Sequence, residues 1–273
     1  MTLHITSHRS GFPLGYTAIT RIGEPDADAG IEFGVLELAE GQSCRFDVTR
    51  ETAFLLMEGT IGLHVEGVTT APLTRTSLFD ESATCLHVSA GQRVAIDARG
   101  GAQLTMFAVD NDRRFEARLY LPKDVPNEHR GKGQVADACY RFVRTIFDRR
   151  NAPEAANLVL GEVITFPGRW SSYPPHHHAQ PEIYHYRFTR PEGFGHAELG
   201  DTVLKVRQYD TVKILDGVDH PQCAAPGYGM YYLWVIRHLP GDPYGIPEFT
   251  AEHRWTLERD ARMWQPRGVA AEP

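Results

Sequence analysis

The sequence has no long hydrophobic run and no leader-like N-terminus. No window approaches 18 consecutive apolar residues, and the first 15 residues lack the charged and then apolar regions of a signal peptide. We therefore expect neither a membrane-spanning helix nor secretion. The sequence predicts a cytoplasmic protein.

Basic residues are too few for a typical nucleic-acid-binding surface. The 273-residue chain has 28 Lys and Arg against 35 Asp and Glu, which gives a formal net charge of −7. Proteins that bind nucleic acid by neutralising phosphates normally carry a basic excess. We therefore expect no nucleic-acid partner and no membrane partner.

Cysteine is scarce and its spacing excludes the common cysteine motifs. Cys44, Cys85, Cys139 and Cys223 lie far apart, so they form no short metal-binding pattern and are expected to be reduced, buried thiols. Histidine, by contrast, occurs 13 times, and three histidines are consecutive at positions 176–178. These three histidines are the first candidates for a functional site.

Short apolar runs, separated by 25 glycines and 18 prolines, predict an all-β core. The predicted strands of the N-terminal half are 31–38, 52–57, 61–65, 94–96 and 104–109, with turns at 58–59, 66–67, 91–93 and 100–101. Those of the C-terminal half are 158–166, 183–188, 197–200, 203–208, 211–214 and 230–235.

Between the two halves the pattern changes. From residue 135 apolar residues recur at offsets of three, four, seven, eight and eleven, which is the stripe of an amphipathic helix. They are Val135, Ala138, Cys139, Phe142, Val143 and Ile146. We therefore predict a connecting helix over Gln134–Arg149. The predicted domains are a β-rich half at 1–125, a linker with this helix at 126–157, and a second β-rich half at 158–273.

The consecutive histidines predict a metal site. In an extended segment His176 and His178 point to one face and His177 to the other. Glu182 follows four residues after His178, and His220 stands before a proline about forty residues later. Three imidazoles and one carboxylate suit a single divalent ion such as Zn²⁺, Mn²⁺ or Fe²⁺. The alternative is a surface loop of solvated histidines. In the N-terminal half no comparable cluster occurs, and no second metal is expected there.

The pattern H-x-H, then Glu, then a later G-x-x-H resembles the metal motif of cupins, which are small antiparallel β-barrels of the jelly-roll type. Two such halves resemble a bicupin. More specifically, four segments resemble the 5-deoxy-glucuronate isomerases of inositol catabolism, relatives of the uronate isomerases of pectin breakdown. These segments are Trp170–His178, Glu182–Phe188, Pro191–Gly195 and Asp216–Val235, with a weaker match at Leu78–Gly91.

This resemblance implies the metal ligands His176, His178, Glu182 and His220. It also implies an aldose–ketose isomerase, an intramolecular oxidoreductase that converts 5-deoxy-glucuronate to 5-dehydro-2-deoxy-gluconate. The sequence departs from the family at His177 and Ala179, where Lys and an acidic residue are typical. A hexuronate isomerase, a dioxygenase of the same fold and a non-catalytic sugar-binding cupin therefore remain alternatives.

Several further residues are candidates for catalysis in such a site. Tyr184, Tyr232 and His177 could act as acids or bases, although tyrosines in a barrel often only pack and His177 could simply face solvent.

A sugar-acid substrate would also need a partner for its carboxylate. Arg169 and Arg187 flank the motif and are the first choices, because guanidinium binds carboxylate bidentately. Trp170 could wall the sugar pocket. The expected partner is thus a small sugar acid, with assembly into a homo-oligomer left open.

Overall fold

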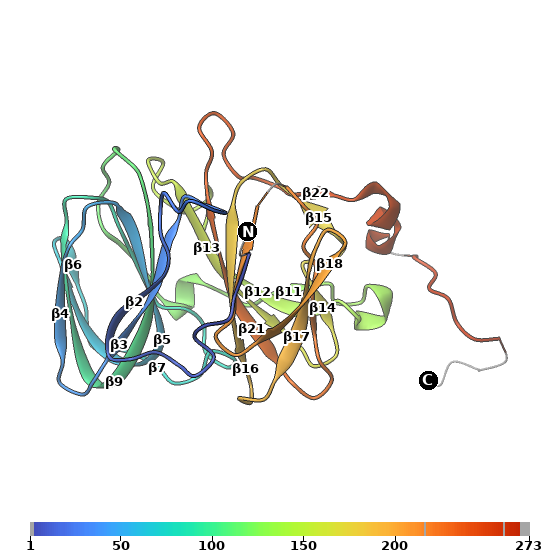
Figure 1. The fold of residues 1–273 in the computed structure, drawn as a ribbon, viewed down its shortest axis with the longest axis horizontal. Coiled ribbons are helices and arrows are strands. Elements are labelled where there is room, and N and C mark those ends of the chain that lie inside the picture. Colours follow the sequence, from blue (N-terminus) through green and yellow to red (C-terminus); the bar gives the residue numbers. More distant parts are fainter. Residues whose placement is uncertain (1–2, 216, 259, 268–273) are drawn as a thin grey trace.

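Two β-barrels lie side by side in the computed structural model, which describes residues 3–215, 217–258 and 260–267 (Figure 1). The N-terminal barrel is built on a nine-stranded sheet in the order β10-β8-β5-β9-β3-β2, with β4 added on β9 and with β6 and β7 added on β5. Its strands are β2 (Gly15–Thr20), β3 (Glu32–Leu38), β4 (Ser43–Asp47), β5 (Glu51–Val65), β6 (Val68–Thr69), β7 (Leu73–Arg75), β8 (Cys85–Val88), β9 (Arg93–Val109) and β10 (Arg118–Tyr120).

The C-terminal barrel faces a seven-stranded sheet against a four-stranded one. The first has the order β1-β19-β16-β21-β13-β12-β11 and the second β14-β20-β17-β18, while β15 and β22 pair at one end of the barrel (Figure 1). The strands are β1 (His4–Ile5), β11 (Glu128–Arg130), β12 (Arg141–Phe147), β13 (Leu158–Thr165), β14 (Trp170–Ser171), β15 (His176–His177), β16 (Glu182–Phe188), β17 (Phe194–Leu199), β18 (Thr202–Arg207), β19 (Thr211–Ile214), β20 (Gln222–Ala224), β21 (Met230–Arg237) and β22 (Glu248–Phe249).

The predicted turns at 58–59 and 100–101 are wrong. Both lie inside single long strands, β5 and β9, which pair with each other along most of their lengths. The pairing register shifts on either side of Gly59, whose φ of +104° suits glycine. Bulges of this kind bend a long strand, so one strand can pass around a barrel where two shorter strands were predicted.

The predicted helix over Gln134–Arg149 is also wrong. Three short 3₁₀ turns, η1 (Pro122–Asp124), η2 (Val135–Asp137) and η3 (Ala251–Leu257), are the helical elements of the described residues. Arg141–Phe147 forms β12 and pairs with β13, because its aromatic and β-branched residues suit a pleated surface. None of the described helices is long and apolar enough to cross a membrane.

Residues 126–157 therefore supply two strands, β11 and β12, to the C-terminal sheet. At the other end of the chain, β1 leaves the N-terminal segment to pair with β19. The division into 1–125, 126–157 and 158–273 stays a prediction, and these strand pairs show how the three segments are joined.

The main hydrophobic core lies between the barrels. It contains residues from both halves, among them Phe33, Leu55, Phe107, Leu160, Ile183 and Leu233. A separate core fills the C-terminal barrel and includes Val163, Tyr184, Tyr186, Val212 and Tyr232. Because side chains alternate along a strand, β16 serves both cores, with Ile183 turned to the interface and Tyr184 turned into the barrel.

Candidate metal centre

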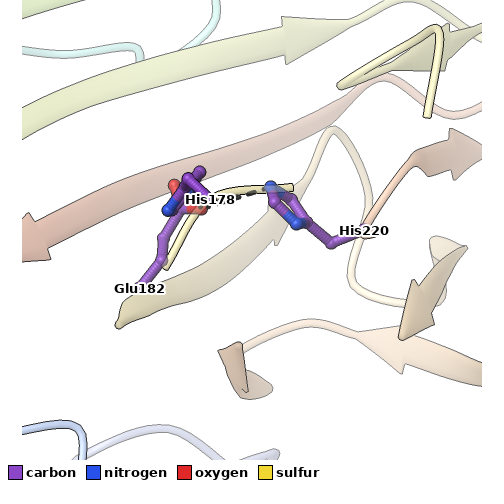
Figure 2. Close-up of side chains that lie close together, drawn as sticks. All are labelled: His178, Glu182 and His220. Carbon is purple, nitrogen blue, oxygen red and sulfur yellow. Dashed lines mark hydrogen bonds and ion pairs between the residues drawn. The ribbon is translucent and has the colours of Figure 1, made fainter. Parts of the chain in front are cut away.

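Three side chains converge at one end of the C-terminal barrel. Glu182 begins β16, His178 lies in the segment before it, and His220 lies in the segment before β20 (Figure 2). One ligand atom from each lies within 4.8 Å of the other two. The Glu182 carboxylate is 3.2 Å from His178 Nε2 and 3.4 Å from His220 Nε2, and all three side chains are at most 7% exposed. This spacing suits three ligands around one ion.

His176 stands beside this group. Its ring centroid is 4.9 Å from that of His220. The Nδ1 atom of His176 donates to the Pro174 carbonyl at 3.0 Å, and Nδ1 of His220 donates to the Val218 carbonyl at 2.8 Å. A hydrogen bond from Nδ1–H to a backbone carbonyl fixes the tautomer in which Nε2 carries a free lone pair. This tautomer is common among histidines that bind a metal through Nε2.

The electrostatics of the cluster also suit a cation. Burial lowers the pKa of His176 and of His220 to about 4, so both imidazoles are neutral at neutral pH. The Nε2 atom of His220 and the Nδ1 atom of His178 are buried and have no hydrogen-bond partner among the described residues. Buried polar atoms without a partner are costly, and a divalent ion among the three side chains would satisfy His220 Nε2. The residues present therefore fit the expected ion.

His177 does not join this group. As the alternation predicted, it points away from its two neighbours, and its Nδ1 atom lies 2.8 Å from the Asp219 carboxylate. Asp219 also accepts a hydrogen bond from Thr250, which comes from the C-terminal segment. His177 thus ties together the segments that carry its neighbours and His220, and its role as an acid or base stays a prediction.

A network of hydroxyl groups lies deeper in the same barrel. Tyr184 and Tyr232 stack with ring centroids 4.6 Å apart, and the ring of Tyr184 is 6.0 Å from that of His220. Ser172 Oγ is 3.2 Å from the Tyr184 hydroxyl and 3.1 Å from that of Tyr232. Burial raises the pKa of Tyr232 to about 12 and that of Tyr184 well above its usual value. Both phenols therefore remain protonated and can donate hydrogen bonds.

The two arginines expected to hold a substrate carboxylate lie elsewhere. Arg187 is on the face of β16 opposite Glu182, where it donates to Gln103 of the N-terminal barrel and lies over the ring of Tyr209. Strand alternation turns Arg187 toward the barrel interface, away from the histidine cluster, and its substrate-binding role stays a prediction.

Arg169 packs its guanidinium over the rings of Tyr140 and Phe166. Trp170 lies on β14 with its ring 5.9 Å from that of Tyr173. Neither contacts the histidine cluster through a hydrogen bond in the described part of the chain. Their substrate-binding roles remain predictions.

Sequence reasoning missed three residues near the cluster. The ring of Tyr244 lies 4.8 Å from that of His178, and the ring of Phe249 lies 5.6 Å from that of His176. Both come from the segment after β21, which carries no motif. The third, Arg141, lies in the predicted helix, and only its position on a strand turns it into this barrel.

The histidines of the N-terminal barrel have other partners. His64 is exposed and lies 3.0 Å from Asp97. His87 is buried with Nε2 2.8 Å from Glu51. Each is thus paired with one carboxylate.

Comparison with known proteins relates the chain to one family. The model of the KduI/IolB family matches residues 5–256. The chain is 29% identical over 269 residues to a 5-deoxy-glucuronate isomerase of Lacticaseibacillus casei, covering 92% of this chain and 91% of that protein. It is 28% identical over 246 residues to a protein of the same name from Bacillus subtilis strain 168, covering 84% and 88%.

Solved structures agree on the fold. An IolB-like protein from Salmonella typhimurium LT2 superposes with a TM-score of 0.83 at 22% identity, covering 94% of this chain and 100% of that one. A cupin 2 conserved barrel domain protein from Leptotrichia buccalis gives a TM-score of 0.52 at 13% identity, covering 86% and 96%. The predicted architecture of two cupin barrels is confirmed, apart from the connecting helix.

Proposed function

The chain belongs to the KduI/IolB family, and we propose that it is an isomerase that converts 5-deoxy-glucuronate to 5-dehydro-2-deoxy-gluconate in inositol catabolism. Relatives that match most of its length are named for this activity. One structural observation supports a location for the active site. A buried carboxylate and two buried imidazoles converge at the end of the C-terminal barrel, with two ring nitrogens that have no hydrogen-bond partner among the described residues.

The proposed ligands of one divalent ion are His176, His178, Glu182 and His220. His178, Glu182 and His220 supply the converging atoms, and His176 lies against His220. When bound, such an ion supplies a Lewis acid for the carbonyl oxygen and the neighbouring hydroxyl oxygen of an aldose.

The reaction needs no external oxidant or reductant. One hydrogen leaves the carbon that bears the hydroxyl and one arrives at the aldehyde carbon, while the hydroxyl loses its proton and the aldehyde oxygen gains one. The aldehyde thus becomes an alcohol as the alcohol becomes a ketone. We propose that Tyr184, which stays protonated, donates a hydrogen bond to a substrate oxygen as negative charge develops on it, while Tyr232 donates to Ser171 and supports the network. Ser172 holds the two phenols in place.

Proton NMR of the purified, metal-replete protein tests this function. With 5-deoxy-glucuronate the aldehyde or hydrate signal should disappear as keto-acid signals grow, without added nicotinamide or oxygen. A requirement for oxygen would instead identify a dioxygenase. Turnover of other hexuronates but not of this substrate would contradict the substrate assignment.

The ligand assignment predicts the effect of removing His220. His220→Ala should lower turnover at least about a hundredfold, because the loss of one ligand disturbs the group that stabilises the transition-state charge. Circular dichroism should show that the fold is intact. Turnover within threefold of the parent enzyme would contradict the assignment.

The cellular location is part of the same proposal. All four cysteines are free thiols in the structure, which supports a reducing compartment such as the cytoplasm.

A further inference from the structure

Arg141 projects into the C-terminal barrel from β12. It is opposite Thr165 in the register of β12 and β13, and Val143, two residues along, is opposite Val163 of the barrel core. Thr165 in turn donates to Ser171, which accepts a hydrogen bond from Tyr232. Alternation along β12 therefore puts Arg141 on the same side of the sheet as the hydroxyl network.

The Arg141 guanidinium has few partners for its position. Nη1 donates to the Cys139 carbonyl at 2.9 Å. Nε is buried and has no hydrogen-bond partner among the described residues. No carboxylate forms an ion pair with Arg141 in that part of the chain, whereas the buried Arg75 and Arg144 both pair with Glu162. A largely buried cation without an anion destabilises the folded protein. An anionic ligand that bound to Arg141 would remove this cost.

The surrounding loop is shaped to hold this side chain. Gly131 follows β11 with φ of +72°, and a Cβ atom there would stand 3.0 Å from Arg141 Nη1 and even closer to the Cys139 carbonyl. Glycine therefore lets the loop lie directly against the guanidinium and the carbonyl that anchors it. The bond through Nη1 leaves Nε and Nη2, which form one edge of the fork, without a hydrogen-bond partner among the described residues, and such an edge can bind a carboxylate bidentately.

Arg141 is also close enough to influence the candidate site. Besides burial, its positive charge contributes to the lowered pKa of His176. The pKa of Arg141 itself is lowered by burial, and the nearby groups that oppose this effect are the phenols of Tyr232 and Tyr184 and the Cys139 thiol. A guanidinium remains charged even so. The cation thus lies on the side of the sheet that carries the two tyrosines, one of which contacts His220 of the cluster.

We propose that Arg141 binds the carboxylate of the substrate through its Nε edge. The inference rests on the proposed function, since it assigns one end of the sugar acid to Arg141 and the aldehyde end to the histidine cluster. It gives Arg141 the role that the sequence suggested for Arg169 and Arg187. Binding would also supply the anion that this buried cation lacks.

Steady-state kinetics of Arg141→Met and Arg141→Lys test the proposal. For 5-deoxy-glucuronate we expect Arg141→Met to raise KM at least about thirtyfold, because two charged hydrogen bonds are lost, and to lower kcat much less. With the carboxamide of the same sugar, the parent and Arg141→Met should differ less than threefold in kcat/KM. Arg141→Lys should fall between them, since it keeps the charge but not the fork.

Two controls separate binding from folding and from metal loading. Arg207→Met removes an exposed arginine of the same barrel and should leave KM unchanged. Elemental analysis should give the same metal content for all variants. Calorimetry with D-gluconate, which carries the carboxylate but cannot isomerise, should show binding to the parent and at least tenfold weaker binding to Arg141→Met.

The outcomes distinguish this inference from the proposed function. An unchanged KM and unchanged gluconate affinity in Arg141→Met, with active parent enzyme, would overturn the role of Arg141 and leave the function standing. Gluconate binding that depends on Arg141, in a protein that isomerises no uronate, would support the carboxylate site and overturn the function. Failure of the parent to bind gluconate would overturn the role of Arg141.

Discussion

At the scale of single residues, three adjacent histidines have two different environments. His176 and His178 lie beside His220, while His177 reaches the Asp219 carboxylate on the other side of the short strand. A strand turns successive side chains to opposite faces, so one added or deleted residue would exchange the roles. Which histidines join His220 therefore depends on their positions along the strand as much as on their being histidines.

This difference predicts the metal content of three neighbouring variants. His176→Ala and His178→Ala should each lose most of the bound ion, because each removes a proposed ligand. His177→Ala should retain at least about four fifths of it. Elemental analysis after gel filtration measures the content, and thermal denaturation checks the fold. Equal loss in all three variants would contradict the assignment of faces.

At the scale of elements, the N-terminal strand shows how a short segment is fastened to a distant barrel. β1 pairs with β19 over two residues. The Asp210 carboxylate, which precedes β19, accepts hydrogen bonds at 2.7 Å from Arg9 and lies 2.7 Å from His4 Nε2. Burial alone would raise the pKa of Asp210, but these partners outweigh it and hold the pKa below its usual 3.8.

Asp210→Asn should therefore lower the free energy of unfolding by about 1.5–3 kcal/mol at pH 7. The folded-state pKa is below the unfolded-state value, so this contribution is complete above about pH 5 and is lost as the pH falls through the folded-state pKa. Urea denaturation at pH 7 and near pH 3.5 should show the difference between variant and parent shrinking at the lower pH. The exposed Asp201→Asn is the control, and a difference that grew on acidification would contradict the linkage.

Arg141–Phe147 is a strand where the sequence pattern predicts a helix. Residues 135–147 satisfy a helical stripe, yet Val135, Ala136 and Asp137 have positive φ and Arg141–Phe147 is a strand. The same residues also satisfy a strand pattern, with Phe142 and Arg144 turned to one face and Arg141 and Val143 to the other. Pairing with the fully buried β13 favours the strand period over the helical one, because the pairing gives hydrogen-bond partners to a row of backbone N–H and C=O groups.

At the scale of the whole molecule, a buried ionic cluster joins the barrels. Glu162 of β13 binds Arg75 of the N-terminal barrel in a bidentate pair at 2.7 and 2.8 Å. It also accepts from Arg144 at 3.3 Å and from Tyr231 at 2.8 Å. Burial would raise the pKa of Glu162, but the two guanidinium groups outweigh it and lower the pKa. The carboxylate is therefore ionised and balances two buried cations.

Glu162→Gln should destabilise the protein by about 3–5 kcal/mol, because it leaves buried arginines without their anion. The exposed Glu192→Gln should change stability by less than about 0.5 kcal/mol. Chemical denaturation of both variants measures the difference. A loss below 1 kcal/mol for Glu162→Gln would show that the cluster contributes little to joining the barrels.

Much of this protein was determined by the sequence alone. Strand positions such as 158–166 and 183–188 follow from local runs, since apolar content and turn residues act within a few positions. The division of His176, His177 and His178 between two faces follows from the period of two. The resemblance carried by short motifs identified the fold and the family, because those motifs lie on rigid strands and their loops.

Only the tertiary structure decided which distant side chains meet. It put Arg187 at the barrel interface and Arg141 in the barrel interior, although both are arginines on strands near the same site. It brought Tyr244 and Phe249 beside the histidines from a segment without a motif. The physical reason is that the face on which a side chain lies depends on pairing register and barrel closure. Both are fixed by contacts between residues far apart in the chain, which local patterns do not contain.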